Sequence, residues 1–185
     1  MKDIYNIEIQ TFYRAELLDS FLSNSNENYN KALQNKIDNK STWDKVVKFY
    51  KEQGYARDVT NVSHLHTNTL MIGINGIIEG IILNISFLPK YIGYYFYHQN
   101  EKPIIPIIDK FGLENSQLSF YPFNRNQEIY CKEILDFVSN LFPTFKLFEN
   151  LYANEKVTNV IMDNTIVKES FFFQVIFEDN MCTIF

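Results

Sequence analysis

The chain has little of several residue types that mark common classes of protein. Its 185 residues include two cysteines, Cys131 and Cys182, and no CxxC spacing. Two isolated thiols are typical of a reducing compartment and do not suggest the disulfide framework of a small secreted scaffold. Six glycines and five prolines are too few for a fibrous or loop-rich protein. The chain therefore has the composition of an ordinary folded domain.

Positive charge is also scarce. The chain has 17 basic and 22 acidic side chains and a net charge of −5, and its only arginines are Arg14, Arg57 and Arg125. Proteins that bind nucleic acid need a footprint of Lys and Arg to displace counterions. An acidic domain also repels anionic lipid at long range and attracts a basic partner. We therefore expect no nucleic acid and no membrane as a partner, and a basic protein surface is favoured.

No apolar run reaches the length of a membrane-spanning helix. The most apolar block, residues 69–97, is interrupted by Asn75, Glu79, Asn84 and Lys90. The N-terminus, MKDIYNIEIQ, carries charge but lacks the apolar segment and cleavage site of a signal peptide. These features predict a soluble, cytoplasmic protein.

Aromatic side chains, by contrast, are abundant. They make up 16% of the chain and include 17 Phe and 12 Tyr. Each large ring buries much apolar area, so the sequence predicts a large and well-fixed core. The length is that of one domain, and we expect residues 1–185 to fold as a single unit.

Residues 69–97 predict a three-stranded antiparallel meander at the centre of a sheet. Asn75-Gly76 separates two β-branched runs, which is a strong hairpin signal, and Pro89-Lys90 separates the second run from an aromatic third. A two-residue turn places Ile74 opposite Ile77. Strict alternation then puts Glu79 on an apolar face, and a β-bulge at Gly80 is predicted because it would move this carboxylate to the other side.

Helical periodicity flanks the meander on both sides. Helices are predicted from Tyr13 to about Leu22, over residues 29–37, and from a Ser41 or Thr42 cap to a left-handed Gly54. The apolar stripe of the third helix is Trp43, Val46, Val47 and Tyr50. A further helix over about 126–141 begins at an Asn126 cap and ends at Pro143.

The remaining segments predict short strands. Residues 102–109 contain two prolines and suit a sheet edge, residues 117–123 form a strand, and two more strands lie at about 145–151 and 157–162. Residues 171–177 and 181–185 are predicted to form a terminal hairpin. The predicted fold class is therefore α+β, with N-terminal helices packed on a central antiparallel sheet, one further helix and C-terminal strands.

His64 and His66 have a metal-like spacing. Residues two apart on a strand point the same way, so both imidazoles could meet one ion, with His98 and either Asp58 or Glu79 completing the site. Because the chain has only three histidines, two surface histidines before a strand are the favoured interpretation. No cofactor is expected, since Gly73, Gly76 and Gly80 fall within strands and a turn rather than in a phosphate-binding loop.

Other motifs for catalysis or nucleic-acid binding are weak. The chain has no GxSxG motif, and Cys131 falls among apolar helix positions, where a small core residue is expected. The aromatic run at residues 94–97 suits stacking on bases, but no basic groove accompanies it. A sheet strand is the favoured interpretation of that run.

A protein partner is the remaining class of ligand. Four carboxylates gather loosely near the C-terminus, and ring anchors at the end of the meander can supply a desolvated centre for a contact. The predicted partner-binding residues are Asp163, Glu169, Glu178, Asp179, Tyr95 and Tyr97.

In its size, acidity and composition the chain resembles the immunity proteins of bacterial toxin–immunity systems. The resemblance implies a non-enzymatic protein that binds a cognate toxin and covers its basic active-site surface. Two alternatives stay open at this point. One is a metal-dependent enzyme that uses His64 and His66, and the other is a structural or regulatory subunit of a larger complex.

Overall fold

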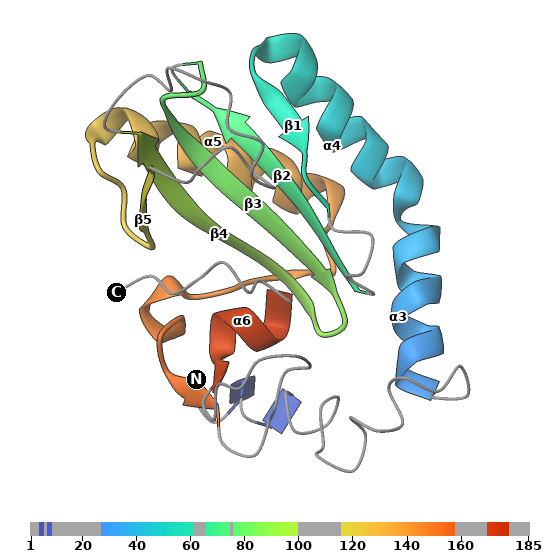
Figure 1. Ribbon diagram of the computed structural model, residues 1–185. Helices are drawn as coiled ribbons and strands as arrows, with labels where there is room; N and C mark the ends of the chain where they lie inside the picture. Colours follow the sequence, from blue (N-terminus) through green and yellow to red (C-terminus); the bar gives the residue numbers. More distant parts are fainter. Residues whose placement is uncertain are drawn as a thin grey trace.

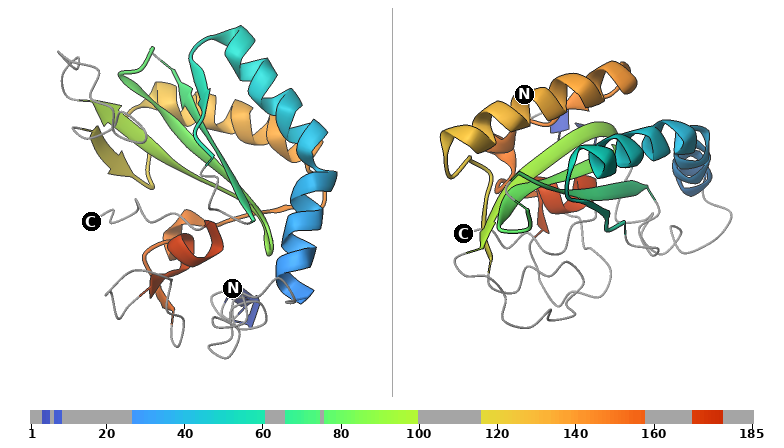
Figure 2. Two further views of the ribbon diagram at one scale, coloured as in Figure 1. Left: turned by 45° about the vertical axis from the view of Figure 1, so that its right-hand side comes forward. Right: turned by 90° about the horizontal axis from the view of Figure 1, so that it is seen from above.

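The computed structural model describes residues 4–5, 7–8, 27–60, 66–74, 76–99, 116–157 and 170–177. Within them a mixed, mostly antiparallel sheet lies between helices on both of its faces (Figure 1). Helices α4 and α5 pack on one face, and α6 lies against the other (Figure 2). The predicted α+β class is confirmed.

The sheet has five strands in chain order and a sixth that pairs with the beginning of the fourth. The antiparallel path is β1 (Ala56–Asp58), β2 (Thr67–Gly73), β3 (Glu79–Phe87), β4 (Lys90–Gln99) and β5 (Ser116–Ser119), and β6 (Lys146–Leu147) pairs with β4 in parallel. A separate two-stranded ladder joins β7 (Lys156–Val157) to β8 (Ser170–Phe171). The predicted meander is therefore present as β2, β3 and β4.

The described helices are α3 (Glu27–Asp38), α4 (Lys40–Gln53), α5 (Arg125–Leu141), α6 (Phe172–Phe177) and a 3₁₀ turn at Asn150–Tyr152. Three of them match predicted helices. None of the described helices is long and apolar enough to cross a bilayer. The helix predicted at residues 13–22 and the edge segment at 102–109 lie outside the described residues.

The predicted helix caps were placed wrongly. Ser41 and Thr42 lie inside α4, because backbone bonds from Asn39 to Asn35 and from Trp43 to Asn39 carry α3 almost directly into α4. Such a junction leaves few free amide groups for a side chain to cap. The C-cap Gly54 has φ 167°, which is extended rather than left-handed. Helix α5 is capped two residues earlier than predicted, by Asn124, whose side chain accepts from the Gln127 amide at 3.0 Å.

Strand β3 is buried along its whole length, because helices cover both faces of the sheet. Ile81, Leu83, Ile85 and Phe87 pack with residues of α4 and α5, including Trp43, Val46, Ile134 and Val138. Ile82 faces the opposite side, among Tyr95, Tyr97 and the rings of α6. A strand that reads as an almost continuous apolar run is typical of a sheet buried on both faces.

The predicted hairpin register is wrong by two residues, and the predicted bulge is absent. Gly73 pairs with Gly80, so the β2–β3 loop is longer than a two-residue turn. The pairing continues without interruption from Thr67 to Gly73 on β2 and from Glu79 to Phe87 on β3. A shift of two keeps every side chain on its face. Glu79 therefore remains on the side of α5, where it finds polar partners.

The predicted terminal hairpin is also wrong, because residues 172–177 form helix α6. Its side chains Phe172, Phe173, Val175, Ile176 and Phe177 are all fully buried. Aromatic and β-branched residues favour strands on average, but such preferences follow the packing environment. A short segment that is apolar on all sides suits a buried helix equally well. Residues 181–185 lie outside the described part of the chain.

Candidate functional site

The structure describes two of the six residues predicted to bind a partner. Tyr95 and Tyr97 are 1% and 0% exposed and belong to the core beneath the sheet, so in this fold they do not offer a surface to another protein. Asp163, Glu169, Glu178 and Asp179 lie outside the described residues. The rings of Tyr95 and Tyr97 on β4 thus point into the core, whereas the sequence analysis predicted them at a partner-binding surface.

The histidines do not converge in the described residues. His66 is fully buried at one end of the sheet, where its carbonyl accepts from the Phe87 amide at 2.7 Å. Phe87 is the last residue of β3. His98, on β4, pairs with Glu79, which is the first residue of β3. Eight residues of β3 separate these two positions, which is roughly 26 Å at about 3.3 Å per residue. The prediction that His98 completes a site with His66 is therefore wrong, and His64 lies outside the described residues.

Glu79 is held by polar groups at the start of α5. Its carboxylate accepts from the Asn124 side-chain amide at 2.7 Å and lies 3.6 Å from His98 Nδ1. Asn124 also caps the helix, so one side chain joins the strand to the helix terminus. A buried carboxylate with such partners does not need the predicted bulge. Within the described ranges, no group of three or more His, Cys, Asp and Glu side chains is arranged to hold a metal ion.

Cys131 is a core residue, as predicted. It is buried on α5 against the sheet, and burial raises the pKa of its thiol to about 12, although a hydrogen bond with Tyr94 lowers it somewhat. Burial also raises the pKa of Tyr94 to about 12, with a further rise from Cys131. A thiol that stays protonated at neutral pH is a poor nucleophile.

This pair predicts alkaline destabilisation. Both folded pKa values lie above the ordinary 9.0 and 10.0, so the folded state holds these protons more tightly than the unfolded chain. Their contribution is complete below pH 9 and is lost as the pH rises towards 12. We expect the free energy of unfolding to fall by about 1.4 kcal/mol per pH unit for each group. For Cys131 the fall begins near pH 9 and for Tyr94 near pH 10, and both end near pH 12.

Urea unfolding at several pH values between 8 and 11.5 measures this slope. Cys131→Val removes the thiol titration with little change of volume, and should flatten the slope between about pH 9 and 10. Tyrosinate absorbance gives an independent readout. Ionisation of Tyr94 near pH 10 in the folded protein would contradict the prediction.

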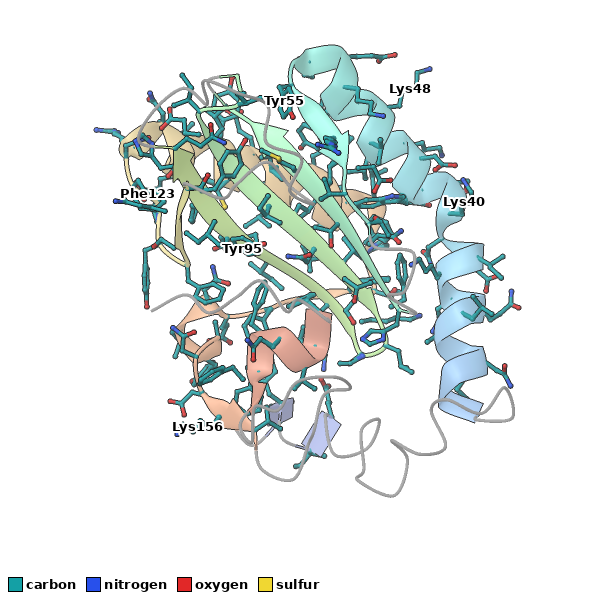
Figure 3. All side chains as sticks on the ribbon, viewed as in Figure 1. Lys40, Lys48, Tyr55, Tyr95, Phe123 and Lys156 are labelled. Atoms are coloured by element: carbon teal, nitrogen blue, oxygen red, sulfur yellow. The ribbon has the colours of Figure 1, made fainter. Side chains whose placement is uncertain are left out.

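The described surface contains a pocket of about 330 Å³ between α4, α5 and the β2–β3 turn. Its wall is formed by the C-terminal end of α4, the connection from α4 to β1, the end of β2, the turn itself and the middle of α5. Tyr55 lies where α4 gives way to β1, beside the turn (Figure 3). The lining residues are Phe49, Tyr50, Gln53, Gly54, Tyr55, Ile72, Gly73, Ile74, Gly76, Tyr130, Glu133, Ile134 and Phe137. The volume is at the lower end of the range of small-ligand sites, roughly 300–1,000 Å³.

Five of the thirteen lining residues carry aromatic rings, and we call this site the aromatic pocket. Phe49 of α4 stacks on Phe137 of α5 with ring centroids 4.2 Å apart, and Tyr50 meets Phe137 edge-on at 5.7 Å. These contacts fix the two helices against each other. Phe49 and Tyr55 are each 37% exposed and Tyr130 is 46% exposed, so their rings keep free surface at the opening.

Glu133 gives the aromatic pocket its charge. It is the one charged residue among those lining the pocket, and it lies one turn beyond Tyr130 and one turn before Phe137 on α5. Burial raises the pKa of the Tyr50 hydroxyl well above its ordinary value, and the charge of Glu133 raises it further. No lysine or arginine in the described ranges lies within ion-pair distance of Glu133. The pocket can therefore receive a cation.

Of the five aromatic rings that line this pocket, sequence reasoning identified one, Tyr50, and assigned it to the core. Phe49, Tyr130 and Phe137 lie beside the apolar stripes of their helices and Tyr55 lies in a connection, so the helical periodicity of apolar residues did not single them out. The spacing of Tyr130, Glu133 and Phe137 along one face of α5 was a usable local signal. Their meeting with Phe49 and Tyr55, some 80 residues earlier in the chain, required the tertiary structure.

Comparison with known proteins gives no relative: no family model matches the chain, and neither the curated proteins nor the solved structures contain a significant match.

Proposed function

We propose that this protein is a non-enzymatic binding protein, an immunity protein that neutralises a cognate bacterial toxin by covering the toxin's basic active-site surface. The observation that carries the proposal is the aromatic pocket. It combines partly exposed Phe and Tyr rings with the carboxylate of Glu133, which pairs with no lysine or arginine in the described part of the chain. Aromatic anchors in a concave site are typical of the centres of protein–protein contacts.

The overall charge supports the same partner. A net charge of −5 favours association with a basic protein and raises its rate of encounter. A toxin that acts on nucleic acid needs a basic surface around its active site. The acidic charge of this chain is complementary to that basic surface, and its partly exposed rings can form the desolvated centre of the contact.

Co-expression tests the proposed function directly. The partner to test is a basic toxin domain encoded next to the gene for this chain. We expect this chain to relieve the growth arrest that the toxin domain causes and to co-purify with it in a stable complex. Absence of both the complex and the protection would overturn the proposal.

A substitution in the aromatic pocket should weaken that complex. Tyr130→Ala removes a partly exposed ring from the pocket wall. Loss of an aromatic anchor at the centre of an interface costs about 2 kcal/mol or more, so we expect the dissociation constant to rise by roughly 30-fold. Isothermal titration calorimetry with the purified toxin domain measures the change.

Tyr121→Ala is the matched control for this experiment. Tyr121 is 65% exposed and does not line the pocket. We expect its removal to change the dissociation constant by less than about twofold. Equal effects of the two substitutions would show that the pocket is not the centre of the contact.

A further inference from the structure

We infer that the aromatic pocket binds the side chain of an arginine from the protein partner, between its exposed rings and the carboxylate of Glu133. The inference rests on the proposed function and names the group that the partner inserts. Three properties of the pocket carry it: the faces of its rings, its single charge and its size.

The rings provide faces on which a flat cation can stack. A guanidinium within about 6 Å of an aromatic centroid is attracted by the negative face of the ring, and this attraction increases when the site is desolvated. Tyr55, in the connection between α4 and β1, and Tyr130, on α5, both line the pocket and keep exposed surface. Phe49 and Phe137 are already stacked on each other, so one face of each ring is occupied.

The charge of the pocket selects a cation over a neutral group. Glu133 is exposed on α5 and no described lysine or arginine pairs with it. Two lysines of α4, Lys40 and Lys48, pair instead with Asp44 and Glu52 and point away from the sheet (Figure 3). A carboxylate beside exposed rings is complementary to a positively charged side chain.

The shape and size favour arginine over lysine. The planar guanidinium can stack on a ring and donate two hydrogen bonds to one carboxylate, whereas an ammonium is a compact, strongly hydrated point charge. A pocket of about 330 Å³ has room for one long side chain and is small for a nucleotide. Basic surfaces that bind nucleic acid are also rich in arginine.

The test uses the whole chain and small probes in place of the partner. N-acetyl-arginine methylamide is titrated into the protein, and the ring and amide signals of the pocket residues are followed by NMR. The citrulline analogue has nearly the same shape without the charge, and the lysine analogue has the charge without the plane. We expect the arginine probe to bind at least five times more tightly than either analogue.

Two variants with the same change of net charge complete the experiment. Glu133→Gln should lower the affinity for the arginine probe at least fivefold and leave the citrulline analogue unaffected. Asp136→Asn lies on the same helix and is exposed, but Asp136 does not line the pocket. We expect it to retain the affinity of the unmodified chain.

Several results would overturn the inference. One is equal affinity for the arginine and citrulline probes, and another is equal loss in the Glu133 and Asp136 variants. Tighter binding of tetramethylammonium than of the arginine probe would assign the pocket to a small-molecule cation instead. Selective binding of arginine without protection from a toxin would leave the site standing and remove the proposed function. Protection from a toxin without selective binding of arginine would support the proposed function and overturn the arginine site.

Discussion

Replacement of Phe173 by alanine is expected to lower the free energy of unfolding by about 3–5 kcal/mol. The side chain is fully buried on α6 and meets four other rings. The centroid distances are 4.6 Å to Phe177, 5.0 Å to Phe120, 5.6 Å to Phe148 and 5.8 Å to Tyr95. Its removal leaves a cavity at the point where α6, β4 and the segment around β6 meet, and rigid neighbouring rings fill such a cavity poorly.

Urea unfolding followed by circular dichroism measures this loss. A typical domain has a free energy of unfolding of about 5–15 kcal/mol. The variant should therefore unfold at a urea concentration well below the unfolding midpoint of the unmodified chain. Phe173→Leu keeps most of the volume and should lose less than half as much. Tyr121→Ala removes an exposed ring and should stay within about 0.5 kcal/mol. A loss below about 1 kcal/mol for Phe173→Ala would contradict the packing of α6 described above.

Replacement of Gly73 by alanine should cost about 2–3 kcal/mol, because the turn folds back onto this residue. A Cβ atom at Gly73 would lie 1.8 Å from the Gly76 carbonyl oxygen and 3.1 Å from the Tyr55 ring. The first contact is with backbone, so the β2–β3 turn itself has to move. Gly73 and Gly76 also line the aromatic pocket, and we expect its affinity for the arginine probe to fall together with the stability.

Two other glycines near this turn are graded controls. Gly76 has φ +62° and open space around it, so alanine there should cost about 1–2 kcal/mol from backbone strain alone. Gly54 has an extended φ of 167° and no atom within 4 Å of a built Cβ, and alanine should change stability by less than about 0.5 kcal/mol. Thermal unfolding of the three variants tests the order, and equal losses at Gly54 and Gly73 would show that close approach is not the cause.

Local signals predicted much of the fold because they depend on a few neighbouring residues. The apolar stripe of Trp43, Val46 and Tyr50 predicted the buried face of α4, and Pro89 marked the break between β3 and β4. The hairpin was located correctly, but its register was not. Turn residues indicate where a chain reverses, whereas the number of residues in the loop depends on how the strands pair.

The candidate site was largely hidden from the sequence. Tyr95 and Tyr97 looked like surface anchors because one face of β4 was expected at a rim, and α6 covers that face instead. The four carboxylates near the C-terminus were predicted to bind a partner because they lie close together in the sequence. Glu133 was not predicted, because it is one of several charged residues on an ordinary helix. Exposure of a ring depends on what packs beside it, and that is a long-range property.

The sequence by itself determined the α+β class, the central meander and the two long helices that flank it, because periodicity and turn residues act within a few positions. The tertiary structure alone decided that residues 172–177 are helical, that Glu79 reaches Asn124, and that Tyr55, Tyr130 and Glu133 share one pocket. Each of these outcomes depends on packing between segments that are distant in the chain, and packing can override local preference.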